Sequence, residues 1–288
     1  MKLHKIETGN FMLDGGATFG VVPKTLWEKV YRSNDMNLCN FSARSLLVEV
    51  EDKKILIDCG LGDKQGDDFF KYYYRNGDYT LESSLRDAGF TFEDITDVIL
   101  THLHFDHVGG AIKSEDNGKL RPTFPNAKYW ISQQQWDWAM NPNPREKPSF
   151  IAENFMPLKV ENRLHFIDEN TDFCEGVELR IYHGHTAGLL VPIINYNGQT
   201  IMYTADLLPT SAHVPLSWIC GYDTRPLVSL EEKKVFLKEA LDNNWLLFFE
   251  HDLYTECCNL KMTEKGIKVN ERFRFDEFLK TLEVAQTV

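Results

Sequence analysis

Short apolar runs alternate along the chain with longer stretches in which apolar and polar residues recur at helical spacing. The runs at residues 44–50 and 54–58 flank a polar turn and predict two paired strands. An apolar run at 97–101 leads directly into a histidine-rich segment, and another occupies residues 245–249. Further strands are predicted at 128–132, 163–167, 178–183, 189–196 and 200–205, and helices at 81–88, 133–140, 229–243 and 276–285.

Strands followed by helices occur in both halves of the chain. This order predicts an α/β protein with two sheets packed face to face and helices outside. No repeat or linker marks a boundary, so we expect one domain over residues 1–288. The proline-rich segment 141–149 is expected to be a loop. The aromatic run 69–74 fits a flap or dimer contact, or an ordinary amphipathic helix.

Composition narrows the class of protein. A net charge of −12 disfavours phosphate contacts, so no nucleic-acid partner is expected. The six cysteines are scattered without a CxxC pair, which is typical of free thiols in a reducing compartment. Neither a signal peptide nor an apolar run of about 18 residues is recognisable. We therefore expect a cytoplasmic protein that does not associate with membranes.

The segment HLHFDH places three imidazoles and a carboxylate within six residues. In an extended chain His102 and His104 point the same way, and Asp106 and His107 follow closely enough to face a neighbouring position. This spacing suits two adjacent metal ions, and imidazole with carboxylate fits Zn²⁺, Mn²⁺ or Fe²⁺. Gly109 and Gly110 then allow a tight backbone turn beneath the site.

Two metal ions need more ligands than this segment supplies. His185 and His251 each follow an apolar run, so strands would deliver them to a shared edge. Asp206 ends another predicted strand and could bridge both ions.

The ordered motifs HLHFDH, GHTAG, AD at a strand end and FFEHD resemble the metallo-β-lactamase superfamily. The resemblance spans the chain from Asp58 to His251. It implies a four-layer αβ/βα sandwich with the metal site at one edge of the two sheets. It also implies the ligands His102, His104 and His185 for the first metal, Asp106, His107 and His251 for the second, and Asp206 for both.

Two further residues are expected near the ligands. Asp58 is a candidate to orient a ligand histidine by a hydrogen bond, although it could simply cap a turn. His183 competes with His185 as a ligand; the family pattern selects His185, which leaves His183 to the core or to the surroundings of the site.

Within the superfamily the chain most resembles N-acyl-homoserine lactonases and methyl parathion hydrolase-like enzymes. Residues 13–23 and 205–213 carry this likeness beside the metal motifs. The lactonases hold a tyrosine near the shared aspartate, whereas this chain continues with Leu207-Leu208-Pro209. Tyr222 and His213 are candidates to replace it, and phosphotriester, aryl ester and thioester hydrolysis stay open.

The residues imply hydrolysis by a hydroxide that bridges two divalent ions. Zn²⁺ is the expected metal, with Mn²⁺ and Fe²⁺ as alternatives. Asp106 is either a proton shuttle to the leaving group or only a ligand. Other reaction classes are a mononuclear-iron dioxygenase of the persulfide type and a non-catalytic metal-binding module. The expected partner is a small-molecule substrate. The resemblance to lactonases also implies that the chain forms a homodimer. Candidate substrate contacts are Phe19, Phe105, His213, Trp218 and Tyr222. Taken alone such residues fit the core better than a pocket, but the motifs place Phe105 and His213 near the metals, which favours these two.

Overall fold

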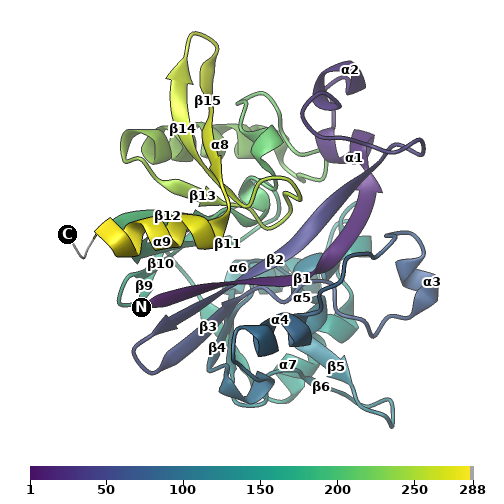
Figure 1. Cartoon of the computed structure of the whole chain (residues 1–288). Helices are drawn as coiled ribbons and strands as arrows, with labels where there is room; N and C mark the ends of the chain where they lie inside the picture. Colours follow the sequence, from purple (N-terminus) through teal and green to yellow (C-terminus); the bar gives the residue numbers. More distant parts are fainter. Residues whose placement is uncertain (286–288) are drawn as a thin grey trace. The chain divides into compact units, whose positions relative to one another are not determined.

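The computed structural model describes residues 1–285, which divide into two compact units. The first unit comprises residues 1–11 and 42–171, and the second comprises residues 12–41 and the chain from residue 172 on. Each unit contains strands of a sheet together with helices (Figure 1). The expectation of a single domain stays a prediction.

A six-stranded sheet in the order β1-β2-β3-β4-β7-β8 organises the first unit. β2 and β3 form the antiparallel hairpin that the sequence predicts, whereas β3, β4, β7 and β8 run parallel. The strands are β1 (Lys2–Asp14), β2 (Leu38–Val50), β3 (Lys53–Ile57), β4 (Asp97–Ile99), β7 (Lys128–Ser132) and β8 (Leu164–Ile167), beside a small hairpin of β5 (Ile112–Ser114) and β6 (Leu120–Pro122).

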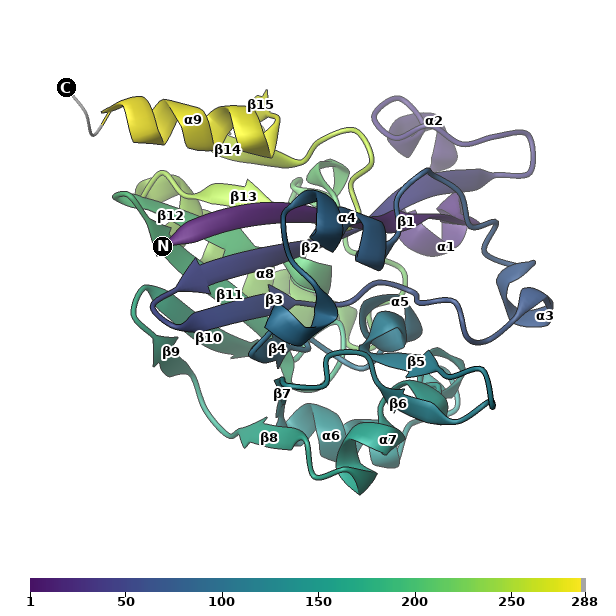
Figure 2. The same ribbon diagram turned by 60° about the horizontal axis from the view of Figure 1, so that its bottom comes forward.

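Side-chain capping explains where two helices of this unit begin. α4 (Leu81–Asp87) begins after Thr80, which forms a capping box with Ser83. α6 (Gln133–Met140) begins after Ser132, whose hydroxyl accepts the backbone N–H of Gln135. Figure 2 shows α6 and α7 (Met156–Val160) near β7 and β8. Two single-turn helices, α3 (Asp67–Phe70) and α5 (Phe105–Val108), complete the set.

A seven-stranded sheet in the order β15-β14-β13-β12-β11-β10-β9 organises the second unit. β12 and β13 run parallel, while β10, β11 and β12 are successively antiparallel. The strands are β9 (Thr171–Cys174), β10 (Val177–Tyr182), β11 (Leu189–Tyr196), β12 (Gln199–Tyr203), β13 (Leu246–Phe248), β14 (Cys257–Thr263) and β15 (Gly266–Phe273).

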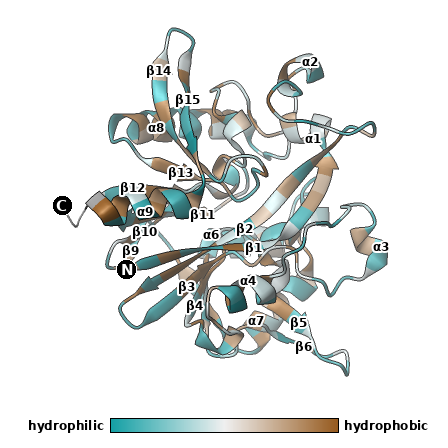
Figure 3. Ribbon diagram, in the orientation of Figure 1, coloured by the Kyte–Doolittle hydropathy of each residue, from teal (hydrophilic) through white to brown (hydrophobic). Residues whose placement is uncertain are grey.

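The long helices of this unit bury one face each. α8 (Pro226–Asp242) packs on β14 and β15 through residues spaced three or four apart, as an amphipathic helix does. α9 (Phe275–Ala285) buries Phe275 against Phe248, with ring centroids 4.8 Å apart. The alternation of apolar and polar residues along α9 is visible in Figure 3. None of the helices in residues 1–285 is both long and apolar enough to cross a bilayer.

The predicted strands and helices are confirmed within a few residues, but several elements were missed. β15 is exposed or half-buried throughout, so it lacks the apolar alternation that identifies a strand. β1 is similarly mixed in burial. The aromatic run at 69–74 forms only the end of α3 and a following turn.

An aromatic stack fixes the short helix α1 (Gly15–Phe19) within the second unit. The rings of Phe19 and His213 lie parallel with centroids 4.7 Å apart, and Trp218 meets Phe19 edge-on. Nε2–H of His213 donates to the carbonyl of Thr18, and Nδ1 accepts from the hydroxyl of Thr210. Because His213 is buried, its pKa falls to about 3, and the ring is neutral.

This burial predicts an acid-sensitive contribution to stability from His213. The unfolded state takes up the proton near the ordinary pKa of 6.5, whereas the folded state does so only near 3. Stabilisation is complete above the higher value and is lost as pH falls toward the lower one. As the pH falls from about 7 to about 4.5, the contribution of His213 should lower the free energy of unfolding by roughly 2–3 kcal/mol. His213→Gln should remove this component in urea unfolding; an unchanged pH dependence would contradict it.

Candidate metal centre

In the first unit, parallel strands carry the metal motif to one edge of the sheet. Asp58 directly follows β3, and the segment 101–107 follows β4, its parallel neighbour. The backbone N–H of Asp58 donates to Ile99, which ties the two strand ends together. Carboxyl ends of parallel strands are where α/β proteins commonly build sites.

The glycines after the motif allow a close backbone approach. A Cβ on Gly109 would lie 1.8 Å from the carbonyl oxygen of Leu61, and one on Gly110 would lie 2.2 Å from that of Cys59. No side chain fits at such distances, so glycine is required at both positions. The Lys64 ammonium also donates to the Gly109 carbonyl, and burial lowers the pKa of Lys64 to about 8.

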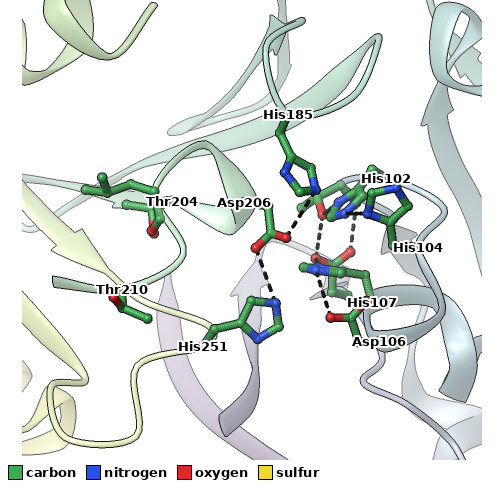
Figure 4. A network of polar contacts seen from close by, with 12 residues as sticks. His102, His104, Asp106, His107, His185, Thr204, Asp206, Thr210 and His251 are labelled. Carbon is green, nitrogen blue, oxygen red and sulfur yellow. Dashed lines mark hydrogen bonds and ion pairs between the residues drawn. The ribbon is translucent and has the colours of Figure 1, made fainter. Parts of the chain in front are cut away.

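Three imidazoles gather in this segment, all nearly or fully buried. Nε2 of His102 lies 3.0 Å from Nδ1 of His104. The rings of His102 and His107 have centroids 3.9 Å apart. Asp106, from α5, places Oδ2 3.9 Å from Nε2 of His107 (Figure 4).

Asp58 holds two of these rings from behind. Its carboxylate accepts the backbone N–H of Thr101 at 2.8 Å, the Thr101 hydroxyl at 2.6 Å and Nδ1–H of His107 at 3.0 Å. Because the Thr101 hydroxyl donates its hydrogen bond to Asp58, its oxygen accepts Nδ1–H of His102 at 3.1 Å. Asp58 is in the left-handed region, with φ of 57°, which aspartate tolerates better than most residues.

His104 is held through its other nitrogen. Nε2 lies 3.0 Å from Oε1 of Glu146, a carboxylate that is itself buried. Glu146 comes from the segment 141–149, for which the sequence predicted only a loop, so its contact was missed.

The ring nitrogens of His102 and His104 that face one another are suited to bind a cation. If His102 donates from Nδ1 and His104 from Nε2, their other nitrogens carry lone pairs that meet at 3.0 Å. Two lone pairs at this distance repel unless a positive ion lies beside them. Neutral imidazole and carboxylate are the ligands that Zn²⁺, Mn²⁺ and Fe²⁺ accept.

In the second unit, three strand ends meet at one sheet edge. β12 runs parallel to β13, and β10 points the same way because two antiparallel pairings separate it from β12. His185, Asp206 and His251 follow these strands.

Asp206 lies between the two imidazoles of this unit (Figure 4). Its Oδ2 is 3.2 Å from Nε2 of His185, and its Oδ1 is 3.3 Å from Nε2 of His251. Ala205, directly before it, has φ of 44°, a conformation that costs about 1–2 kcal/mol in a residue with a Cβ. This left-handed residue changes the direction of the backbone after β12, directly before Asp206.

His185 is fixed by the segment that leads into α8. Nδ1–H donates to Asp223 at 2.9 Å, which leaves Nε2 toward Asp206. The carbonyl of His185 accepts both the N–H and the hydroxyl of Thr224. Asp223 and Thr224 carry no spacing signal in the sequence and were missed.

His183 is oriented differently from His185. Its backbone N–H and that of Gly184 donate to the carboxylate of Glu232 on α8. Its ring accepts the N–H of Gly188, which closes the turn, and burial lowers the pKa of His183. A Cβ on Gly184 would collide with Ser229. His183 and Glu232 thus shape the turn that carries His185.

The predicted substrate contacts differ in exposure. Phe19 and His213 are almost completely buried in the stack with Trp218, and Tyr222 is 39% exposed. Both ring nitrogens of His213 have partners inside the unit, which leaves no obvious donor for a substrate. Substrate binding by these four residues stays a prediction.

Phe105 packs in an aromatic group of the first unit. Its ring centroid is 5.3 Å from that of Phe69 and 4.6 Å from that of Tyr73. Burial, with the nearby charge of Asp106, raises the pKa of Tyr73 and keeps its hydroxyl protonated. The aromatic run 69–74 therefore contributes two side chains that pack against Phe105.

Known proteins resemble the chain over most of its length. The family model of the metallo-β-lactamase superfamily matches residues 41–251. An N-acyl homoserine lactonase from Bacillus cereus is 25% identical over 285 residues, covering 93% of this chain and 96% of the relative.

Solved structures agree in fold. A probable metal-dependent hydrolase from Staphylococcus aureus superposes with a TM-score of 0.85 at 27% identity, covering 94% of this chain and 96% of its own. AidC, a dizinc quorum-quenching lactonase in complex with a product, gives 0.78 at 26% identity, with coverages of 95% and 97%. The predicted α/β sandwich class is confirmed. The chain belongs to the metallo-β-lactamase superfamily and is a metal-dependent hydrolase.

Proposed function

We propose that the chain is a dinuclear hydrolase of lactones or related esters. The observation that carries the proposal is the orientation of the imidazoles. His102, His104, His107 and His185 each contact a protein oxygen through one ring nitrogen, and the other ring nitrogen faces a further member of the proposed ligand set. Metal-ligating histidines commonly donate their other ring N–H to an oxygen acceptor in this way.

The order of the motifs in the family supports the assignment of ligands. Asp206 suits the shared position because each of its oxygens faces a different imidazole. Under this assignment His102, His104 and His185 hold one ion, and Asp106, His107 and His251 hold the other.

Zinc is the metal we propose, with Mn²⁺ and Fe²⁺ as alternatives that the same ligands accept. AidC, similar over nearly its whole length, is described as a dizinc enzyme. Two bound divalent ions would lower the pKa of water from about 15.7 toward about 7 and polarise the substrate carbonyl.

The residues beside the ions divide the remaining work. Asp106 is almost buried and adjoins His107, so its carboxylate can hold the proton that the leaving oxygen needs. Phe105, Phe69 and Tyr73 offer an apolar surface next to it, which suits an acyl chain.

The lactone preference follows from relatives named as N-acyl homoserine lactonases. This chain has no tyrosine directly after Asp206, where the resemblance to homoserine lactonases led us to expect one. Aryl esters, thioesters and phosphotriesters are the alternative substrates. A homodimer and a cytoplasmic location remain predictions.

The proposal predicts lactone turnover that depends on His104. We expect purified enzyme to open acyl-homoserine lactones faster than it hydrolyses an aryl ester or a phosphotriester. His104→Ala should reduce kcat/KM about 1,000-fold, equivalent to about 4 kcal/mol of transition-state stabilisation. The control is His165→Ala, because His165 lies on β8 against Trp130 and away from the motif. Turnover of a phosphotriester without lactone turnover would reject the substrate class.

The proton role of Asp106 has its own test. Asp106→Asn keeps the shape and one ligand oxygen but cannot accept a proton at neutral pH. We expect kcat for a lactone to fall about 100-fold or more while at least one metal ion stays bound. Full activity with normal metal content would show that Asp106 is only a ligand.

A further inference from the structure

A buried carboxylate contacts the second histidine of the metal motif. Oε1 of Glu146 lies 3.0 Å from Nε2 of His104, and the two side chains are 3% and 8% exposed. Glu146 comes from the segment 141–149, far from the motif in sequence. Burying a carboxylate is costly unless donors surround it, so its position requires an explanation.

Other donors fix which oxygen faces His104. Oε2 of Glu146 accepts Nε1–H of Trp138 at 2.6 Å and Nδ2–H of Asn143 at 3.1 Å. The indole N–H is a donor only. Since Oε2 is thus occupied, Oε1 is the oxygen presented to His104.

The loop itself is built to hold this carboxylate. Oδ1 of Asn143 accepts the backbone N–H groups of Arg145 and Glu146. Asn143 therefore holds Glu146 at two points: its side-chain Oδ1 accepts the backbone N–H of Glu146, and its Nδ2–H donates to the carboxylate of Glu146. Prolines at 142, 144 and 148 restrict the backbone around it.

His104 differs from the other held histidines of its unit. His102 and His107 have Nδ1 engaged and present Nε2, whereas His104 has Nε2 engaged and presents Nδ1 toward Nε2 of His102. Asp58 serves the first two rings, directly or through Thr101, and Glu146 serves the third.

We propose that Glu146 is the positioning residue of His104: it holds the Nε2–H tautomer and so directs the Nδ1 lone pair to the metal. This inference rests on the proposed function only in taking His104 as a metal ligand. A carboxylate behind a ligating imidazole also fixes the ring orientation and raises the basicity of the ligand.

Glu146→Gln is a sharp test because an amide cannot satisfy both sides. If its oxygen faces His104, its NH₂ group meets the N–H donors of Trp138 and Asn143. If it is flipped, its NH₂ group faces Nε2, which favours the opposite tautomer with Nδ1 protonated. Either arrangement weakens the lone pair offered by Nδ1. The matched control is Glu153→Gln, the same change at an exposed carboxylate.

The measurement is Zn²⁺ affinity of the full-length protein by competition with a chelator. We expect Glu146→Gln to weaken binding of one Zn²⁺ about 10- to 100-fold, and Glu153→Gln to match wild type. The imidazole ¹⁵N spectrum of zinc-loaded wild type should show a protected Nε2–H on His104, assigned by its absence in His104→Ala. Glu146→Gln with affinity within about threefold of wild type, and with that signal unchanged, would overturn the proposal.

A folding defect in Glu146→Gln leaves a second route. In metal-free wild type at alkaline pH, the ¹⁵N shifts of His104 report its tautomer directly. The Nε2–H form supports the positioning role, and the Nδ1–H form overturns it. Neither result depends on catalysis, so failure to find lactone turnover would affect the proposed function alone. Conversely, unchanged Zn²⁺ affinity in His104→Ala would remove the ligand assignment on which both rest.

Discussion

The carboxylate of Asp58 is the contact on which the first half of the site depends. It sits at the end of β3 and accepts three hydrogen bonds from the segment after the parallel strand β4. Through Thr101 it also determines which nitrogen His102 presents. Because all these groups are buried, losing one of the hydrogen bonds would leave a buried polar group unsatisfied, at a cost of about 1–3 kcal/mol. The segment is therefore held in one conformation.

The second unit solves the same problem with different residues. Asp223 accepts Nδ1–H of His185, just as Asp58 accepts Nδ1–H of His107. Glu232 accepts the backbone N–H of His183, in the turn before His185. Asp58 and Ala205 are both in the left-handed region; Asp58 directly follows β3, and Ala205 is the second residue after β12. A backbone that leaves a strand in the left-handed region turns sharply, which brings polar side chains onto the sheet edge instead of into solvent.

The sequence predicted what depends on local pattern. The spacing of HLHFDH and the apolar runs before His185, Asp206 and His251 identified the candidate donors, and periodicity located most strands and helices. It did not reveal the residues that orient the donors. Glu146, Asp223 and Thr224 reach the histidines through tertiary contacts from loops, and no spacing distinguishes them from other polar loop residues. Phe19 and His213 show the converse limit, because an aromatic near a motif can be a substrate contact or, as their burial favours, part of the core.

We propose that these imidazoles and carboxylates hold two divalent ions for hydrolysis. Elemental analysis of the purified full-length protein tests it most directly, with His251→Ala as the comparison. We expect two divalent ions per chain, most of them zinc, and the loss of one ion in the variant. A single iron per chain, unaffected by His251→Ala, would contradict it and point to oxygenation instead.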